Sequence, residues 1–398
     1  RYKVKEVDVL NSRTADFAPD YAGGPDLIYF TSSRESSEGD KLNEVSGNPY
    51  TDIFYSMKDR KGDWSEPTPA KGDVNTEYDE GAPCLVDDGF VMFYTSCKLI
   101  KNKDMGCKIY TSELNGQEWS EPSIIELFQD SSISVGHPAV TQDQLTMYFA
   151  SDYSAGKGGK DIWRTTRETP DDPWQTPENM GDSVNTPGDE LYPYIHPNGT
   201  LYFSSNGRVG MGGLDIYKAE KNEEDKWVVS NMRPPINSQA DDFGITFEMD
   251  RNRGLFSSSR GQRGGIDRIF SFSLPPLEFN LVGVVVERET EKPLQDANVK
   301  IYGSDGTIRE KKSSEEGQFR FELDKETDYR VVTTKKDYLK GKGKETTRGL
   351  DKSKTLRMTI TMAPIDKPIE LPNILYDLNS AELRPESMVA LDELVTTL

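Results

Sequence analysis

The sequence is poor in the residue types on which many active sites depend. It has only two histidines and three cysteines in 398 residues. Neither His137 nor His196 lies in HExxH, G-x-S-x-G or another motif with a mechanism. The chain has no C-x-x-C pair, no Cys/His cluster and no phosphate-binding P-loop. From these absences we predict no catalytic residue, no metal site and no cofactor.

Long hydrophobic runs are missing as well. No apolar stretch approaches the ~20 residues needed to cross a bilayer. The chain begins at Arg1, without Met and without a signal peptide, so we expect it to be a piece of a longer precursor. Any membrane contact would then depend on a lipid anchor absent from this chain. At 34% hydrophobic and 10% aromatic residues, the composition is that of a globular protein.

Positive charge is scarce in most of the chain. The formal net charge is −20, and nearly all of it lies in residues 1–278. Residues 279–363 hold slightly more basic than acidic residues. An acidic surface repels nucleic acid at long range, so we predict no nucleic-acid partner. The acidity is more typical of a large β-rich surface kept soluble by charge.

The three cysteines are Cys84, Cys97 and Cys107. An oxidised Cys97–Cys107 pair is possible, with one thiol left over. If the two residues lie on adjacent strands, their disulfide would close a short loop.

Internal repetition is the strongest signal in the sequence. Segments such as LIYFTS, VMFYTS, TMYFAS and TLYFSS recur, each followed by a third strand, a tryptophan and often VNT or INS. The third strand begins D-I-Φ in three of these units, whereas the second unit has Lys108 in place of the aspartate. Trp64, Trp119, Trp174 and Trp227 follow one another at 53 to 55 residues. Four short alternating strands at a period near 50 are typical of a propeller blade. Because these residues recur in every unit, we interpret them as packing and turn elements.

These units resemble the PD40 repeats, the WD40-like β-propeller repeats of TolB-type and outer-membrane-associated bacterial proteins. The resemblance rests on Pro197–Ser205 and on Gly212–Tyr217, with similar segments in three other units. The fifth unit lacks a final strand, and VKEVDVLNS (4–12) matches the missing segment. We therefore predict a five-bladed β-propeller over residues 1–275, closed by the N-terminal strand.

A glycosidase propeller is the enzymatic alternative, because it needs only two carboxylates. Acidic turns at the start of the blades, such as those with Glu190 and Asp242, offer candidates. No pair stands out in the sequence, so this alternative ranks below a non-enzymatic one.

Two further domains follow the repeats. Residues 279–363 alternate in five strand-like segments and predict a small antiparallel β-sandwich. Lys292–Val299 and Glu316–Phe321 resemble the carboxypeptidase regulatory-like (transthyretin-like) domain, which implies a spacer without chemistry. Residues 364–371 form a proline-containing linker.

Residues 372–398 resemble the start of an OmpA-like peptidoglycan-binding domain, an α/β fold, through Leu375–Ser387. The resemblance covers about a quarter of such a domain, so we expect it to be truncated. It implies that Asp377, Asn379 and Ser380 border the ligand in the intact protein only.

This order of domains is similar to that of the PorE-like outer-membrane lipoproteins of the Bacteroidetes type IX secretion system. The resemblance implies a non-enzymatic periplasmic scaffold that links an outer-membrane secretion complex to peptidoglycan. Peptidoglycan would bind through the truncated domain, and secretion-complex or outer-membrane proteins would bind the propeller. The alternative is a glycan-binding or sensing surface lipoprotein or, ranked lower, a glycosidase-type propeller.

Overall fold

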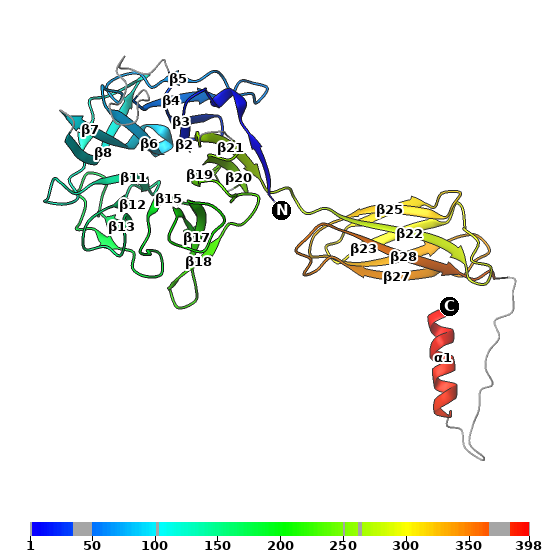
Figure 1. Ribbon diagram of the computed structural model, residues 1–398. Helices are drawn as coiled ribbons and strands as arrows, with labels where there is room; N and C mark the ends of the chain where they lie inside the picture. The colour runs from blue at the N-terminus through cyan, green and yellow to red at the C-terminus, as the bar shows by residue number, and fades with distance from the viewer. Residues whose placement is uncertain are drawn as a thin grey trace. The chain divides into compact units, whose positions relative to one another are not determined.

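The computed structural model describes residues 2–34, 50–100, 103–249, 251–261, 265–365 and 383–397. The chain divides into two compact units, Arg1–Pro275 and Pro276–Leu398. It is mainly β, as the sequence predicted, and α1 (Pro385–Thr397) is the one α-helix within these ranges (Figure 1). No helix in the described ranges is long and apolar enough to cross a membrane.

Five antiparallel sheets make up the first unit. The first holds β2 (Asp16–Tyr21), β3 (Leu27–Ser32), β4 (Asp52–Met57) and β5 (Thr68–Pro69). The second holds β6 (Asp79–Val86), β7 (Val91–Ile100), β8 (Lys103–Asn115), β9 (Glu118–Trp119) and β10 (Ser123–Ile124). The third holds β11 (Val135–Val140), β12 (Thr146–Ser151), β13 (Asp161–Thr166) and β14 (Glu178–Asn179). The fourth holds β15 (Glu190–Ile195), β16 (Leu201–Ser205), β17 (Asp215–Lys221) and β18 (Trp227–Asn231). The fifth holds β19 (Asp242–Phe247), β20 (Arg253–Ser258), β21 (Arg268–Ser273) and β1 (Lys3–Glu6).

The five sheets form a propeller-like ring (Figure 1). The first strand of each sheet contacts the first strand of the next, in the order β2, β6, β11, β15 and β19, and β19 contacts β2 again. The N-terminal β1 pairs with β21, from Lys3 opposite Ser273 to Glu6 opposite Phe270. The two ends of this unit therefore meet in one sheet.

Hydrophobic clusters between neighbouring sheets hold the ring together. The repeated tryptophans pack toward the preceding sheet. Trp119 lies edge-on to Tyr29, with ring centroids 5.6 Å apart, and Trp174 lies edge-on to Phe93 at 6.3 Å. Their recurrence in four of the five units is therefore explained by packing.

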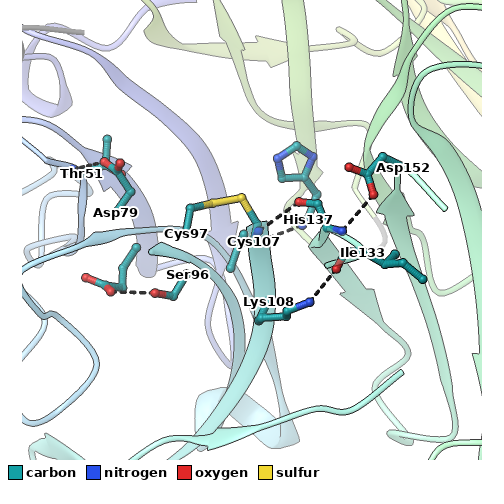
Figure 2. The surroundings of a disulfide bond; sticks show 12 residues. Thr51, Asp79, Ser96, Cys97, Cys107, Lys108, Ile133, His137 and Asp152 are labelled. Atoms are coloured by element: carbon teal, nitrogen blue, oxygen red, sulfur yellow. Dashed lines mark hydrogen bonds between the residues drawn. A yellow bond between two sulfur atoms is a disulfide. The ribbon is translucent and has the colours of Figure 1, made fainter. Parts of the chain in front are cut away.

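A disulfide joins Cys97 on β7 to Cys107 on β8 (Figure 2). The two residues are direct partners across the strand pair. Next to the bond, the Cys107 N–H donates to the Ser134 hydroxyl at 3.0 Å, and the Lys108 ammonium donates to the Ile133 carbonyl at 2.5 Å. These contacts connect the end of the second sheet to the segment that leads into β11.

Removing this disulfide should destabilise the first unit by roughly 2–3 kcal/mol, since it closes a loop with a sequence separation of 10. The double variant Cys97→Ser/Cys107→Ser should unfold at lower denaturant concentration than the wild type. All five tryptophans lie before residue 276, so their fluorescence follows this unit. Reductant should destabilise the wild type and leave the variant unchanged; an equal effect on both would contradict the prediction.

The second unit is a sandwich of two sheets. One sheet has the order β25 (Gln318–Leu323), β22 (Phe279–Glu287) and β28 (Lys354–Met362). The other has the order β24 (Ile308–Lys312), β23 (Asn298–Gly303), β26 (Asp328–Thr334) and β27 (Gly341–Thr346). Their inward side chains share a single core.

The predicted antiparallel sandwich needs correction at one strand pair. β22 and β28 run parallel, from Phe279 opposite Lys354 to Glu287 opposite Met362. In the sequence between β22 and β28, the chain forms β25 and all four strands of the other sheet. It then returns to the first sheet, where β28 lies beside β22 and runs in the same direction. Alternation of apolar residues shows which side of a strand is buried, but not the direction of its neighbour.

Candidate functional site

A cavity of about 1080 Å³ lies within the ring of the first unit. It is lined by the first strands of all five sheets and by the turns that follow them. Aromatic rings, two histidines and several carboxyl groups line it, together with backbone from the five strands. A large concave space with few convergent polar groups is the usual form of a ligand site.

The same irregularity occurs in each of the five innermost strands. The pairing register shifts by a β-bulge, and one residue at the bulge has positive φ. These residues are Ala18, Ala82, His137, Tyr192 and Gly244, with φ between 47° and 59°. Bulges redirect side chains and are frequent beside active sites. Here they line the cavity on all sides.

Two of these five positions carry large side chains. The left-handed conformation costs roughly 1–2 kcal/mol for a residue other than glycine, and it is rare for bulky residues. Ala and Gly occupy the position in three sheets, whereas His137 and Tyr192 occupy it in the third and fourth. Strain that is retained at adjacent positions of a cavity wall points to a ligand-binding role.

His137 and Tyr192 form a stacked pair. Their ring centroids are 3.8 Å apart with an interplanar angle of 10°. The Tyr192 N–H donates to His137 Nδ1 at 3.4 Å. At the equivalent positions, Ala18, Ala82 and His137 donate their own N–H to a hydroxyl of the preceding sheet. In the third sheet, Ala150 occupies the position of the hydroxyl residue, so no hydroxyl can accept the Tyr192 N–H. The imidazole of His137 accepts this hydrogen bond instead.

The protonation state of His137 follows from these contacts. Burial, with a smaller contribution from Lys160, lowers the pKa of His137 to about 3. The imidazole is therefore neutral at physiological pH. Since Nδ1 accepts the Tyr192 N–H, the ring proton is on Nε2, which remains a donor.

Further rings extend this aromatic wall. Tyr194 stacks on Phe247 with centroids 5.8 Å apart, and His196 lies edge-on to Phe247 at 5.1 Å. All three residues line the cavity beside Tyr192. The wall therefore offers ring faces to a ligand and has polar atoms at its edges.

Asp20 on β2 is a half-buried carboxyl group that lines the cavity. It accepts hydrogen bonds from the Leu85 N–H and from the Thr246 hydroxyl, both at 2.8 Å, and so connects three strands. Burial raises the pKa of Asp20 to about 6, although these hydrogen bonds oppose the shift. A carboxyl group with this pKa is partly protonated near neutral pH and can donate a proton.

The raised pKa predicts a pH-dependent stability. The folded state binds the Asp20 proton more tightly than the unfolded state, so this contribution to stability is complete below pH 4 and is lost as the pH rises through 6. Asp20→Asn cannot ionise. Between pH 5 and pH 8 the wild type should therefore lose on the order of 1 kcal/mol of unfolding free energy that the Asp20→Asn variant does not lose. Urea unfolding followed by tryptophan fluorescence measures the difference. Parallel pH profiles would contradict the prediction.

The acidic turns considered for catalysis have a structural role. Glu190 and Asp242 are fully buried and lie outside the cavity lining. Glu190 accepts from the Thr186 N–H and hydroxyl and from the Ser205 hydroxyl. Asp242 accepts from the Ser238 N–H and hydroxyl and from the Ser258 hydroxyl. Each carboxylate therefore fixes the turn that precedes its own strand.

The other residues selected from the sequence have different outcomes. Asp377, Asn379 and Ser380 lie outside the described residues. The disulfide joins Cys97 and Cys107, while Cys84 is a buried free thiol beside the cavity. Within the described ranges no group of three metal-ligating side chains exists.

The sequence interpretation missed His137 and Tyr192 as a pair. A signal was present, because the segments DFAP, EGAP, VGHP and ELYP align at the start of successive units. Their third residue is the bulge position, and it is large in only two of them.

Comparisons with known proteins identify no family. No protein-family model and no curated protein matches the chain. Similar solved structures include an α-L-arabinofuranosidase of Podospora anserina (12% identity, 67% of this chain and 93% of that one, TM-score 0.42). Others are an arabinanase of Bacillus subtilis (13%, 65% and 94%, 0.42) and a hydrazine synthase of Kuenenia stuttgartiensis (7%, 86% and 62%, 0.40).

These comparisons correct the functional expectation. The prediction of a non-enzymatic secretion scaffold is corrected, because no match supports a PorE-like identity and several of the similar structures are by name glycoside hydrolases. The alternative of a glycan-binding or glycosidase-type protein is favoured over it. At these identities and TM-scores, the likeness assigns neither a substrate nor a catalytic residue to this chain.

Proposed function

We propose that Arg1–Pro275 is a five-bladed β-propeller whose central cavity binds a saccharide. The five sheets, the closed contacts of their first strands and the pairing of β1 with β21 support the blade count. The Cys97–Cys107 disulfide supports an oxidising compartment such as the periplasm, since thiols are kept reduced in the cytosol. Peptidoglycan and outer-membrane partners stay predictions from the sequence.

The observation that carries the proposal is the strained His137–Tyr192 stack in the cavity wall. A sugar ring has apolar C–H faces that pack on aromatic rings and hydroxyl groups that need hydrogen-bond partners around its edge. The wall offers both, because Tyr192, Tyr194 and Phe247 supply rings and His137 and Asp20 supply polar atoms. The cavity volume suits an oligosaccharide of a few units.

Isothermal titration calorimetry of the whole chain tests this function. The probes are soluble neutral oligosaccharides of glucose, xylose, arabinose and N-acetylglucosamine. We expect saturable binding of at least one of them with one site per chain. The absence of binding by every probe at millimolar concentration would overturn the proposal.

Hydrolysis of the bound glycosidic bond is the second candidate, favoured by Asp20. Its pKa of about 6 suits a general acid. Glycoside hydrolysis also needs a second carboxylate, and Asp143 and Glu178 line the same cavity. The appearance of new reducing ends in the calorimetry mixtures, lost in Asp20→Asn, distinguishes an enzyme from a binding protein.

A further inference from the structure

One end of the cavity, between the third and fourth sheets, combines two cations with two aromatic rings. Arg164 on β13 is the direct cross-strand partner of Tyr148 on β12. Lys221 on β17 is the partner of Trp227 on β18, and its ammonium lies 5.5 Å from the Trp227 ring centroid. All four residues line the cavity. We call Tyr148, Arg164, Lys221 and Trp227 the cationic subsite.

Arg164 is available for a ligand. It is partly buried, and in the described part of the chain it forms no ion pair. Its Nε is buried without a hydrogen-bond partner. Burial raises the pKa of Tyr148, and the charges of Arg164 and Lys221 and a hydrogen bond from Arg164 oppose this shift, so both cations lie near the Tyr148 hydroxyl.

The carboxylates around the cationic subsite do not neutralise Arg164. Glu178 is its cross-strand neighbour on β14 but is exposed to solvent and makes no ion pair with it. Asp143 accepts hydrogen bonds from the Thr141 hydroxyl and the Leu145 N–H in its own turn. Lys221 would divide its charge between Asp225 and a ligand, because its ammonium lies 2.7 Å from the Asp225 carboxylate.

The same strand position in the other sheets supports a specific role for Arg164. Tyr55, Thr111, Lys218 and Ser271 occupy it on β4, β8, β17 and β21. Lys218 is the only other cation, but it does not line the cavity and pairs with Glu220 at 2.6 Å. Only the third sheet therefore directs a cation into the cavity from this position.

Resting on the proposed function, we infer that the saccharide is acidic and that its carboxylate binds Arg164 and Lys221 while its ring packs on Trp227. A guanidinium matches the two oxygens of a carboxylate through parallel N–H donors. A uronic acid unit combines such a carboxylate with a ring that has apolar faces. This ligand would supply the counter-ion that Arg164 lacks among the described residues.

The experiment compares trigalacturonate with its neutral methyl ester by calorimetry on the whole chain. The wild type should bind the acid at least tenfold more tightly than the ester at low salt, and the preference should shrink as salt is added. Arg164→Gln should remove the preference by weakening the binding of the acid to the level of the ester. Lys218→Gln, the matched variant on the next sheet, should keep the preference.

The outcomes separate the two proposals. Equal affinity for acid and ester, or a preference that survives Arg164→Gln, would overturn the inference while saccharide binding stands. Binding of neither these probes nor the neutral set would overturn both. If Arg164→Gln fails to fold, the exposed Lys221→Gln takes its place and should reduce the preference at least threefold. An unchanged preference would then overturn the inference.

Discussion

Replacing Tyr192 by glycine should weaken saccharide binding at least tenfold and lower the stability of the first unit by no more than about 2 kcal/mol. Tyr192 has φ of 49°, which glycine adopts without strain and which tyrosine adopts at a cost of roughly 1–2 kcal/mol. Relief of this strain offsets part of the loss of the ring contacts with His137 and Phe243. Gly244 already occupies the equivalent position in the fifth sheet. Calorimetry with the best-binding probe and urea unfolding measure the two effects.

The matched control is Ala18→Gly. It changes the same bulge position in the first sheet but removes no ring from the cavity. We expect unchanged binding and unchanged or slightly higher stability. A Tyr192→Gly variant that binds like the wild type would contradict a ligand role for the stack. A loss of several kcal/mol of stability would show that the ring serves folding instead.

Deleting residues 1–12 should prevent cooperative folding of the first unit. β1 covers the outer edge of β21 with four residue pairs, and Tyr2 packs edge-on to Phe272 at 5.6 Å. The Asn11 side chain also exchanges two hydrogen bonds with the Ile269 backbone, at 3.0 and 2.8 Å. Together these contacts contribute several kcal/mol, a large part of a typical domain stability.

Tryptophan fluorescence in a urea titration measures this loss. Truncation after Ala363 is the control, because it removes only residues of the second unit. The control should unfold at the same urea concentration as the whole chain. A deleted chain that unfolds at the same midpoint as the control would refute the closing role of β1. Partial recovery on adding a peptide of residues 1–12 would support it.

The ring of sheets could be predicted because its determinants are local and repeated. Asn75, Asn185 and Asn237 belong to the VNT and INS segments, and each bonds the backbone of the third strand of its sheet. Asn11 in the N-terminal segment makes the same contact with Ile269. The similarity of that segment to the repeats therefore reflects the same physical contact.

The site could not be predicted in the same way, because it depends on departures from the repeat. A bulge changes which side chain faces the cavity, and strand alternation alone does not reveal its position. The stack of His137 on Tyr192 also requires two neighbouring sheets to be placed side by side. The sequence indicated the acidic turns as catalytic candidates because they contain carboxylates. In the structure, Glu190 and Asp242 instead accept hydrogen bonds from the turns that precede their strands.

The pairing of β1 with β21 also determines how the first unit responds to mechanical force. Lys3 and Ser273, the outermost partners, lie close to the two ends of this unit, Arg1 and Pro275. A pull on these ends therefore loads the hydrogen bonds of the antiparallel pair one after another, as in a zipper, and does not shear them together. Each bond contributes only about 1 kcal/mol, so the ring should open at this seam under low tension.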